Sequence, residues 1–285
     1  MRVAVTGGSG NLGRAVLDEL IEHEHDVVNL DLVRPRERVC PFVRVDLTEY
    51  GQVVEALTAV DDRYSGVDAV VHLAAIPGPG MATNATTFVN NVTASYHVFT
   101  AARAAGITNV VWASSETLLG LPFTTPPPYI PADEAYPARA ETAYALAKQL
   151  EETMAAEMCR WTPELKLIGL RFSNVMAPED YAAFPSYQDD ARLRSWNLWS
   201  YIDRRDGAQA VRLALAAEMT GLHVYVIANA DTVMHRPSAD LAAEVYPDVP
   251  LVRPLSGNET MLSIDKARRE LGYEPRHSWR DTVTT

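Results

Sequence analysis

The chain has 285 residues, of which 47% are hydrophobic, and this length suffices for one large α/β domain. Its formal net charge of −12 argues against nucleic-acid or anionic-membrane binding, since both depend on basic surface, and favours a small-molecule partner. Strand-like sequence starts at Arg2 and no apolar run approaches membrane-spanning length, so we expect a soluble, cytoplasmic protein without membrane association.

Cysteine and histidine usage points away from disulfides and metals. Cys40 and Cys159 lie far apart, so we expect reduced, buried thiols. His23 and His25 read as part of a solvated helix end, and no Cys/His cluster has zinc spacing. We predict no metal site.

The first thirteen residues predict a strand, a phosphate-binding loop and a helix start. Gly7 permits a tight turn, Gly10 has no Cβ to keep a pyrophosphate away, and Gly13 lets the helix pack closely on the sheet. Apolar residues then recur at helical spacing, so free helix N–H groups point into the loop. We predict a nucleotide site that includes Asn11 and Leu12, with an ordinary glycine-rich turn as the alternative.

The second predicted strand, 27–30, ends in Asp31. An acid at this place accepts hydrogen bonds from the adenosine ribose hydroxyls and repels a 2′-phosphate, which favours NAD over NADP. Two alternatives stay open: Asp31 is a helix cap or loop acid, or Arg34 and Arg36 nearby receive the phosphate of NADP.

Two further strand ends carry candidate residues. The strand at 42–45 leads to Asp46, which either reaches the adenine amine or caps the helix that starts near Glu49. The strand at 68–73 leads to small residues, where a ligand can approach the backbone.

A long helix at 84–105, stopped by Gly106, contains Asn91. A buried Asn in a helix needs a specific contact, and an exposed one is equally compatible with the sequence.

A strand at 109–113 runs into Ser114, Ser115 and Glu116. The alternation of strands and helices predicts an α/β fold with a Rossmann-type doubly wound parallel sheet. Ligands bind past the carboxyl ends of such strands. Five separate positions should therefore meet at one crevice: Gly7, Asp31, Asp46, Ala74 and Ser115.

Next comes the segment 121–137, with six prolines. It is too stiff and irregular for a sheet interior, so it either forms a wall or lid of the pocket or is a plain surface loop.

The helix predicted at 139–160 carries Tyr144 and Lys148 one turn apart on the same face. A cation so placed lowers the pKa of the phenol and makes it a usable proton donor and acceptor near neutral pH.

In this order the motifs resemble the extended short-chain dehydrogenase/reductase family, the NAD-dependent epimerase/dehydratase group. The resemblance implies that Tyr144 is the general acid/base, that Lys148 tunes it and holds the nicotinamide ribose, and that Ser115 hydrogen-bonds the reacting oxygen. It implies NAD contacts from Gly7, Gly10, Asn11, Leu12, Gly13, Asp31, Asp46, Leu47, Leu73, Ala74, Ala75, Asn91, Tyr144, Lys148 and Phe172. The implied substrate contacts are Ile76, Ser115, Glu116, Tyr144, Ser173 and Asn174, the last two after a sixth strand at 165–170.

Departures from the family pattern narrow the range of possible substrates. Glu116-Thr117 lacks the second carboxylate of the dehydratases, so Glu116 either contacts substrate or is an exposed loop acid. The segment between Asn174 and Tyr201 is shorter than in nucleotide-sugar enzymes and favours a small substrate without a nucleotide. The compact chain and the run 196–206 are similar to uronate dehydrogenases. Trp196 and Trp199 then offer stacking surface, and an arginine either meets a carboxylate or forms an ordinary ion pair, the candidates being Arg171, Arg192 and Arg194.

We expect an NAD-binding domain at 1–173 and a small substrate-binding lobe at 174–285, parts of which return to the main sheet. The lobe should contain a strand at 223–227, a helix at 238–245 capped by Ser238, and a helix at 264–271 stopped by Gly272. By resemblance, the helices at 84–105 and 138–160 form a homodimer interface. The leading hypothesis is an NAD-dependent oxidoreductase acting on a small sugar or sugar acid; the alternatives are a sugar epimerase and a non-catalytic NAD-binding regulatory protein.

Overall fold

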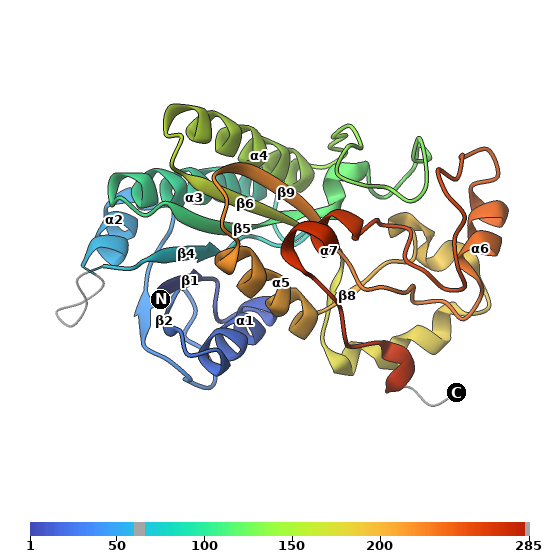
Figure 1. The fold of residues 1–285 in the computed structure, drawn as a ribbon, viewed down its shortest axis with the longest axis horizontal. Coiled ribbons are helices and arrows are strands. Elements are labelled where there is room, and N and C mark those ends of the chain that lie inside the picture. The colour runs from blue at the N-terminus through green and yellow to red at the C-terminus, as the bar shows by residue number, and fades with distance from the viewer. Residues whose placement is uncertain (60–65, 283–285) are drawn as a thin grey trace.

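A computed structural model describes residues 1–59 and 66–282 of the chain. Its centre is a seven-stranded sheet in the order β3-β2-β1-β4-β5-β6-β9, in which every neighbouring pair is parallel (Figure 1). The order reverses direction between β1 and β4, which confirms the predicted doubly wound, Rossmann-type sheet. The strands are β1 (Arg2–Thr6), β2 (Asp26–Asp31), β3 (Phe42–Arg44), β4 (Ala69–His72), β5 (Asn109–Ser115), β6 (Lys166–Phe172) and β9 (Gly221–Ile227).

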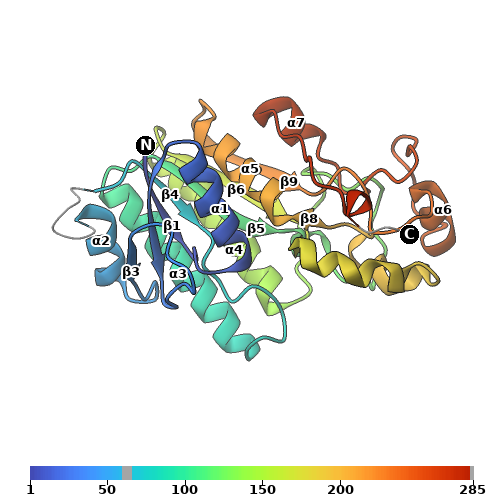
Figure 2. The same ribbon diagram turned by 90° about the horizontal axis from the view of Figure 1, so that it is seen from below.

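Helices cover both faces of the sheet, as its apolar strands require. On one face α1 (Asn11–Glu22) packs beside α5 (Arg204–Ala216). The other face carries α2 (Tyr50–Thr58), α3 (Asn84–Ala104) and α4 (Ala143–Trp161), with α3 between the other two (Figure 2). All seven residues of β6 are buried between these two layers, so its run of apolar side chains contributes to both cores.

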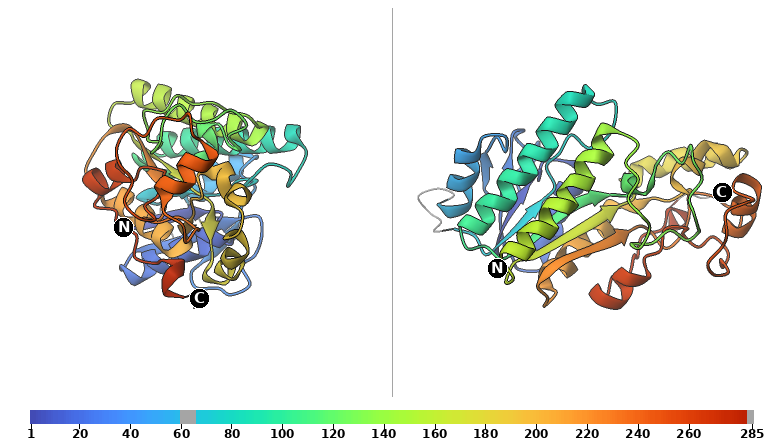
Figure 3. Two further views of the ribbon diagram at one scale, coloured as in Figure 1. Left: turned by 90° about the vertical axis from the view of Figure 1, so that its right-hand side faces the viewer. Right: turned by 90° about the horizontal axis from the view of Figure 1, so that it is seen from above.

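Beyond the carboxyl ends of the strands lie most of the shorter elements (Figure 3). A two-stranded parallel pair, β7 with β8, connects this region to α5, and β9 then returns to the edge of the main sheet. The shorter elements are η1 (Glu116–Leu119), β7 (Val175–Met176), η2 (Pro178–Tyr187), η3 (Ala191–Asn197), β8 (Ile202–Asp203), α6 (Ser238–Val245), α7 (Asp265–Leu271) and η4 (Trp279–Asp281).

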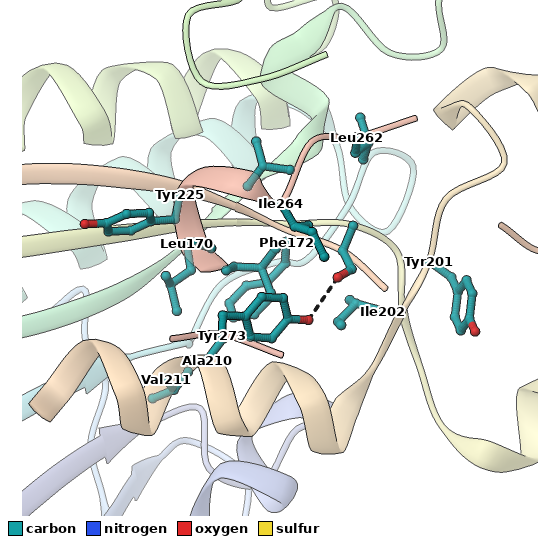
Figure 4. Packing of buried hydrophobic residues seen from close by; sticks show 14 of the residues in the cluster. Leu170, Phe172, Tyr201, Ile202, Ala210, Val211, Tyr225, Leu262, Ile264 and Tyr273 are labelled. Atoms are coloured by element: carbon teal, nitrogen blue, oxygen red, sulfur yellow. Dashed lines mark hydrogen bonds between the residues drawn. The ribbon is translucent and has the colours of Figure 1, made fainter. Parts of the chain in front are cut away.

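One hydrophobic cluster joins the sheet to this outer region. It runs without interruption from Val3 on β1 to Trp279 on η4. Figure 4 shows part of it, where Tyr273 lies between the sheet and α5 and its hydroxyl donates to the Ala228 carbonyl at 2.9 Å. The outer region and the α5 face of the sheet therefore share a core.

Helix ends follow local chemistry, with two departures from the sequence prediction. Gly272 directly follows α7 and Gly106 follows α3 after the cap residue Ala105, and both glycines take positive φ values, of 69° and 73°, as predicted helix stops. The helix predicted from residue 139 begins only at Ala143, because Thr142 caps it by accepting a hydrogen bond from the Ala145 N–H at 3.1 Å. The prediction that Ser238 caps α6 is wrong: Pro237 holds the cap position, and the Ser238 hydroxyl donates to the Glu259 carbonyl at 2.7 Å.

Strand lengths differ slightly from prediction. β5 and β6 each extend two residues past their predicted ends, to Ser115 and Phe172. None of the described helices is long and apolar enough to cross a lipid bilayer.

Candidate active site

A cleft of about 1030 Å³ lies along the carboxyl ends of the strands. The predicted site residues in its wall are Gly7, Gly10, Asn11, Leu12, Gly13, Asp31, Asp46, Leu47, Leu73, Ala74, Ala75, Ile76, Ser115, Glu116, Tyr144, Lys148, Phe172, Ser173 and Asn174. The sheet topology thus brings together positions that are up to 167 residues apart, between Gly7 and Asn174. Among the cofactor and substrate contacts that the family resemblance implies, Asn91 alone lies outside this wall.

Two glycines of the loop at the start of α1, Gly7 and Gly13, have no room for a side chain. A Cβ on Gly7 would lie 2.6 Å from the Ala74 nitrogen, and one on Gly13 would lie 2.1 Å from the Gly7 carbonyl oxygen. Gly10 has more space, since its nearest neighbour would be the Gly7 oxygen at 3.3 Å. α1 begins at Asn11, so the free N–H groups of its first turn belong to this loop. Such a cradle fits the pyrophosphate of a dinucleotide.

Asp31 is fixed at the end of β2 by the same loop. Its two carboxylate oxygens accept hydrogen bonds from the backbone N–H groups of Ser9 and Val33, both at 3.0 Å. It caps no helix, and its place in the cleft wall fits a ribose partner. Arg34 and Arg36 are exposed, and neither lines the cleft.

Asp46 makes a turn rather than a helix cap. It accepts hydrogen bonds from the N–H and the hydroxyl of Thr48, at 2.9 and 2.7 Å, and these bonds hold the pKa of Asp46 below its usual range. The N-cap of α2 is Glu49, so the capping alternative is wrong. Asp46 remains available in the cleft wall.

Asn91 is buried and holds the loop after β4. Its amide accepts from the Ile76 N–H at 2.8 Å and donates to the Ile76 carbonyl at 3.0 Å. The alternative of an exposed Asn is therefore wrong. Any influence of Asn91 on a ligand passes through the backbone of Ile76, which does line the cleft.

Ser115 and Tyr144 meet where β5 ends and α4 begins. The Ser115 oxygen accepts hydrogen bonds from the N–H and the hydroxyl of Thr117, at 3.2 and 2.9 Å, which leaves its own proton free to donate. The Lys148 nitrogen lies 5.9 Å from the centre of the Tyr144 ring. Burial raises the pKa of Tyr144 and outweighs the opposite influence of Lys148 and Ser115. The cation thus limits a rise in pKa rather than producing a net fall.

Lys148 has a buried partner that the sequence analysis missed. Its ammonium donates to the Ala113 carbonyl at 2.8 Å and to Glu151 at 2.9 Å, and the two side chains are 3% and 0% exposed. Burial alone would lower the pKa of Lys148, but the Glu151 carboxylate and the neighbouring Tyr144 turn the net direction upward. The spacing of three residues on a helix was the available signal for this pair.

A polar network behind the site reaches the loop after β4. His72 is hydrogen-bonded to Thr6 at 2.7 Å and to Ser95 at 3.0 Å, and the Ala74 N–H donates to the Thr6 hydroxyl at 3.3 Å. Burial lowers the pKa of His72 to about 3, so the ring is neutral at physiological pH. The network fixes the strand ends without adding charge.

Glu116 is buried beside Ser115 and is only 4% exposed, so its interpretation as an exposed loop acid is wrong. One carboxylate oxygen accepts from the Asn197 side chain at 3.2 Å. The other oxygen, Oε2, and the hydroxyl of Ser173 have no hydrogen-bond partner in the described part of the chain. Burial raises the pKa of Glu116 to about 7, against the influence of Ser173, Asn197 and Arg194.

The three candidate arginines do not line the cleft. Arg171 forms a bidentate ion pair with Glu152 at 2.9 and 2.8 Å, and Arg192 is exposed. Arg194 is buried with its guanidinium 4.8 Å from the centre of the Trp196 ring. The prediction that one of these arginines binds a carboxylate of the substrate therefore gains no support.

The two candidate tryptophans lie in different environments. Trp196 is half-buried and lines the cleft. The prediction that Trp199 offers stacking surface is wrong, because this ring is fully buried in the core.

The proline-rich segment contributes to the cleft wall through Leu121 and Pro122. Further on, Ile130 and Ala132 form isolated bridges to Leu251 and Leu262. The segment is therefore packed against the C-terminal region, and its interpretation as a plain surface loop is wrong.

Cys159 is buried, whereas Cys40 is only half-buried, and both are free. Residues 1–59 and 66–282 contain no group of three His, Cys, Asp or Glu side chains arranged to hold a metal ion.

Comparison with known proteins identifies the family. A profile of the NAD dependent epimerase/dehydratase family matches residues 3–228. The chain belongs to this family. Two relatives that are similar over nearly the whole chain are named for different activities. L-arabinose 1-dehydrogenase (NAD(P)(+)) of Haloferax volcanii is 27% identical over 96% of both chains. UDP-glucose 4-epimerase of Corynebacterium glutamicum is 25% identical over 98% of this chain and 92% of its own.

A solved structure has the same fold. A short-chain dehydrogenase/reductase superfamily protein from Agrobacterium tumefaciens, solved with bound NAD, has a TM-score of 0.74 at 22% identity and covers 98% of this chain and 94% of its own. Membership confirms the predicted resemblance and the enzyme class: the protein is an NAD-dependent enzyme of the extended short-chain dehydrogenase/reductase type. NAD is thus the cofactor, as predicted.

Proposed function

We propose that the protein is an NAD-dependent oxidoreductase that transfers hydride between the cofactor and a small sugar or sugar-acid-like substrate. The observation that carries this proposal is the convergence of Ser115, Tyr144 and Lys148 in one cleft with the glycine loop. A full-length relative named as an L-arabinose dehydrogenase supports the same reaction class.

Each residue of this set has a role that follows from its chemistry. Bound NAD supplies the hydride acceptor. The Tyr144 phenolate takes the proton of the substrate hydroxyl, while Ser115 donates a hydrogen bond to the same oxygen. Lys148 stabilises the phenolate, and its own position is held by Ala113 and Glu151.

The remaining wall residues have proposed binding roles. Gly7, Gly10 and the first turn of α1 hold the pyrophosphate, and Asp31 holds the adenosine ribose. The adenine and nicotinamide ends contact Asp46, Leu47, Leu73, Ala74, Ala75 and Phe172, with Asn91 acting through Ile76. Substrate contacts come from Ile76, Ser115, Glu116, Ser173 and Asn174.

A sugar epimerase is the second candidate, because several relatives are named as UDP-glucose 4-epimerases. The two functions differ in a direct measurement, since an epimerase returns the hydride and yields no net NADH. A non-catalytic NAD-binding regulator is a third possibility, against which the presence of both Tyr144 and Lys148 counts.

We also propose a cytoplasmic homodimer formed through α3 and α4. Large apolar side chains are exposed on both helices, with Val89 59%, Tyr96 47% and Leu146 44% exposed. The assignment of residues 1–173 to NAD binding and of 174–285 to a substrate-binding lobe stays part of this proposal.

The test is a scan of free aldoses, uronic acids and nucleotide sugars with NAD and NADP in parallel. We expect net NADH formation with a free sugar, with NAD favoured over NADP. Tyr144→Phe should lower kcat by about 10²- to 10⁴-fold and leave NAD affinity, measured by calorimetry, unchanged. Unaltered turnover in this variant would rule out the assigned role of Tyr144.

A further inference from the structure

We propose that Ser9 is a positioning residue that holds the Asp31 carboxylate toward the adenosine ribose and thereby makes the protein prefer NAD to NADP. This inference rests on the proposed function through the contact of Asp31 with that ribose, and it is independent of the substrate. Asp31 supplies the charge that repels a 2′-phosphate, and Ser9 keeps this charge in place.

Ser9, Asp31 and Val33 form a closed ring of hydrogen bonds. The backbone N–H groups of Ser9 and Val33 each donate to one Asp31 carboxylate oxygen, both at 3.0 Å. The Ser9 hydroxyl donates to the Val33 carbonyl at 2.6 Å. Ser9 therefore holds one carboxylate oxygen directly and fixes the residue that holds the other. All three residues line the cleft.

Asn29 on β2 fixes the Ser9 hydroxyl from behind. The Asn29 side chain is fully buried, and its amide nitrogen donates to the Ser9 oxygen at 3.2 Å. A Cβ on Gly8 would lie 2.5 Å from the Asn29 Oδ1 atom, so this amide packs directly against the loop backbone. Because the Ser9 oxygen accepts from Asn29, its own proton is directed to Val33. The hydroxyl thus joins the glycine loop to the end of β2.

The ring of hydrogen bonds leaves the Asp31 carboxylate open to a ligand. Asp31 is half-buried in the cleft wall, and each of its oxygens accepts one hydrogen bond from the backbone. Each oxygen keeps a further lone pair, because an ionised carboxylate offers about four acceptor sites. The two oxygens therefore match the two neighbouring hydroxyls of a ribose.

The same ring makes the charge of Asp31 selective. A mobile carboxylate could rotate away from a 2′-phosphate, whereas rotation here would break two hydrogen bonds to a charged acceptor, which are the stronger kind. Ser9 also fixes the chain just before Arg34, through the Val33 carbonyl. Arg34 and Arg36, which could attract such a phosphate, are exposed and do not line the cleft.

The test is calorimetric titration of the purified protein with NADH and with NADPH, without any substrate. We expect the wild type to bind NADH at least about 10-fold more tightly, because like charges at close range are unfavourable. Ser9→Ala keeps the backbone N–H but removes both hydrogen bonds of the hydroxyl, so it should weaken NADH binding by about 5- to 20-fold. Binding of NADPH should change by less than about 2-fold, since a released carboxylate repels its phosphate less. The preference for NADH should therefore narrow.

Ser186→Ala is the matched control. Ser186 is exposed and lies outside the cleft wall, and its hydroxyl likewise donates to a backbone carbonyl, that of Ala183, at 2.7 Å. This variant should change neither affinity. Ser9 is only half-buried, so Ser9→Ala should fold, and circular dichroism checks this.

Asp31→Asn separates this inference from the proposed ribose contact. It removes the repelling charge and should abolish most of the preference for NADH. Adding Ser9→Ala to Asp31→Asn should not narrow the preference further, because Ser9 acts through Asp31.

Two outcomes would overturn the inference while the ribose contact stands. In the first, Asp31→Asn narrows the preference, but folded Ser9→Ala keeps the wild-type ratio of the two affinities. In the second, Ser9→Ala narrows the preference equally with and without Asp31→Asn. A wild type that binds both cofactors equally, or an unchanged ratio in Asp31→Asn, would refute the ribose contact and the inference together.

Discussion

The buried Lys148–Glu151 pair is expected to set the pH range in which Tyr144 works. The Lys148 nitrogen lies 5.9 Å from the Tyr144 ring centre and 2.9 Å from Glu151, which places the carboxylate within about 9 Å of the ring. At an effective dielectric constant near 20, a unit charge at this distance destabilises a phenolate by roughly 2 kcal/mol. Glu151 therefore opposes the ionisation that Lys148 promotes.

Glu151→Gln removes this charge at nearly constant volume. We expect the ionisation equilibrium of Tyr144 to shift toward phenolate by a factor of about 20. Sugar oxidation needs the phenolate, which is present above the pKa of Tyr144 and lost below it. A lower pKa therefore moves the acid limb of the kcat/KM profile to lower pH, by roughly one pH unit. The assay is NADH formation between pH 6 and 11, because the pKa of Tyr144 lies above its usual value.

The neighbouring Glu152 provides the matched control, because it forms a second largely buried ion pair on α4, with Arg171 at 2.8 Å. Glu152→Gln should destabilise the fold to a similar extent, by about 3–5 kcal/mol, without moving the acid limb. The charged groups that act on Glu151 are Lys148 and Glu152, and Glu151 in turn acts on Tyr144. An unmoved limb in Glu151→Gln, a shift to higher pH, or an equal shift in both variants would refute the reasoning.

Three further outcomes are expected. Gly13→Ala should weaken NAD binding in calorimetry by at least about 100-fold, since its Cβ would lie 2.1 Å from the Gly7 oxygen, whereas Gly51→Ala on α2 has nothing within 4 Å and should bind normally. Burial raises the pKa of Glu116 from 4.5 to about 7, so the free energy of unfolding of the wild type should fall as pH rises between these values. At pH 8 Glu116→Gln should be more stable to heat than the wild type, by up to about 3 kcal/mol. This difference in stability should disappear near pH 4. Lys166 donates to the carbonyls of Ala214, Leu215 and Ala217 at the end of α5, and Lys166→Met should cost about 2–3 kcal/mol in urea unfolding. Lys266→Met should cost less, because Lys266 donates one hydrogen bond, to the Val224 carbonyl, and otherwise contacts the Tyr225 ring.

Positions at strand ends were predictable because topology alone brings them together. Parallel strands end at one edge of the sheet, so Gly7, Asp31 and Ser115 follow from the strand order. Tyr144 and Lys148 follow from helical spacing within one segment.

Contacts between distant segments were not predictable from local patterns. The Ser238 hydroxyl turns from the helix cap to Glu259, 21 residues away, and the Asn91 amide is satisfied by Ile76. Helical spacing puts Glu151 near Lys148, but only the packing of α4 against the sheet removes that pair from water. Trp199 shows the same limit, since a large aromatic in an irregular segment is equally compatible with a pocket wall and a core.

The cluster that extends from Val3 to Trp279 bears on how the protein unfolds. Because the sheet and the outer region share one hydrophobic cluster, heat or urea should melt both in a single cooperative transition. A fragment ending at residue 173 would lose its packing partners on the α5 face and expose that surface to aggregation. The residues that line the cleft come from both parts of the chain, whereas the shared core predicts a single folding unit.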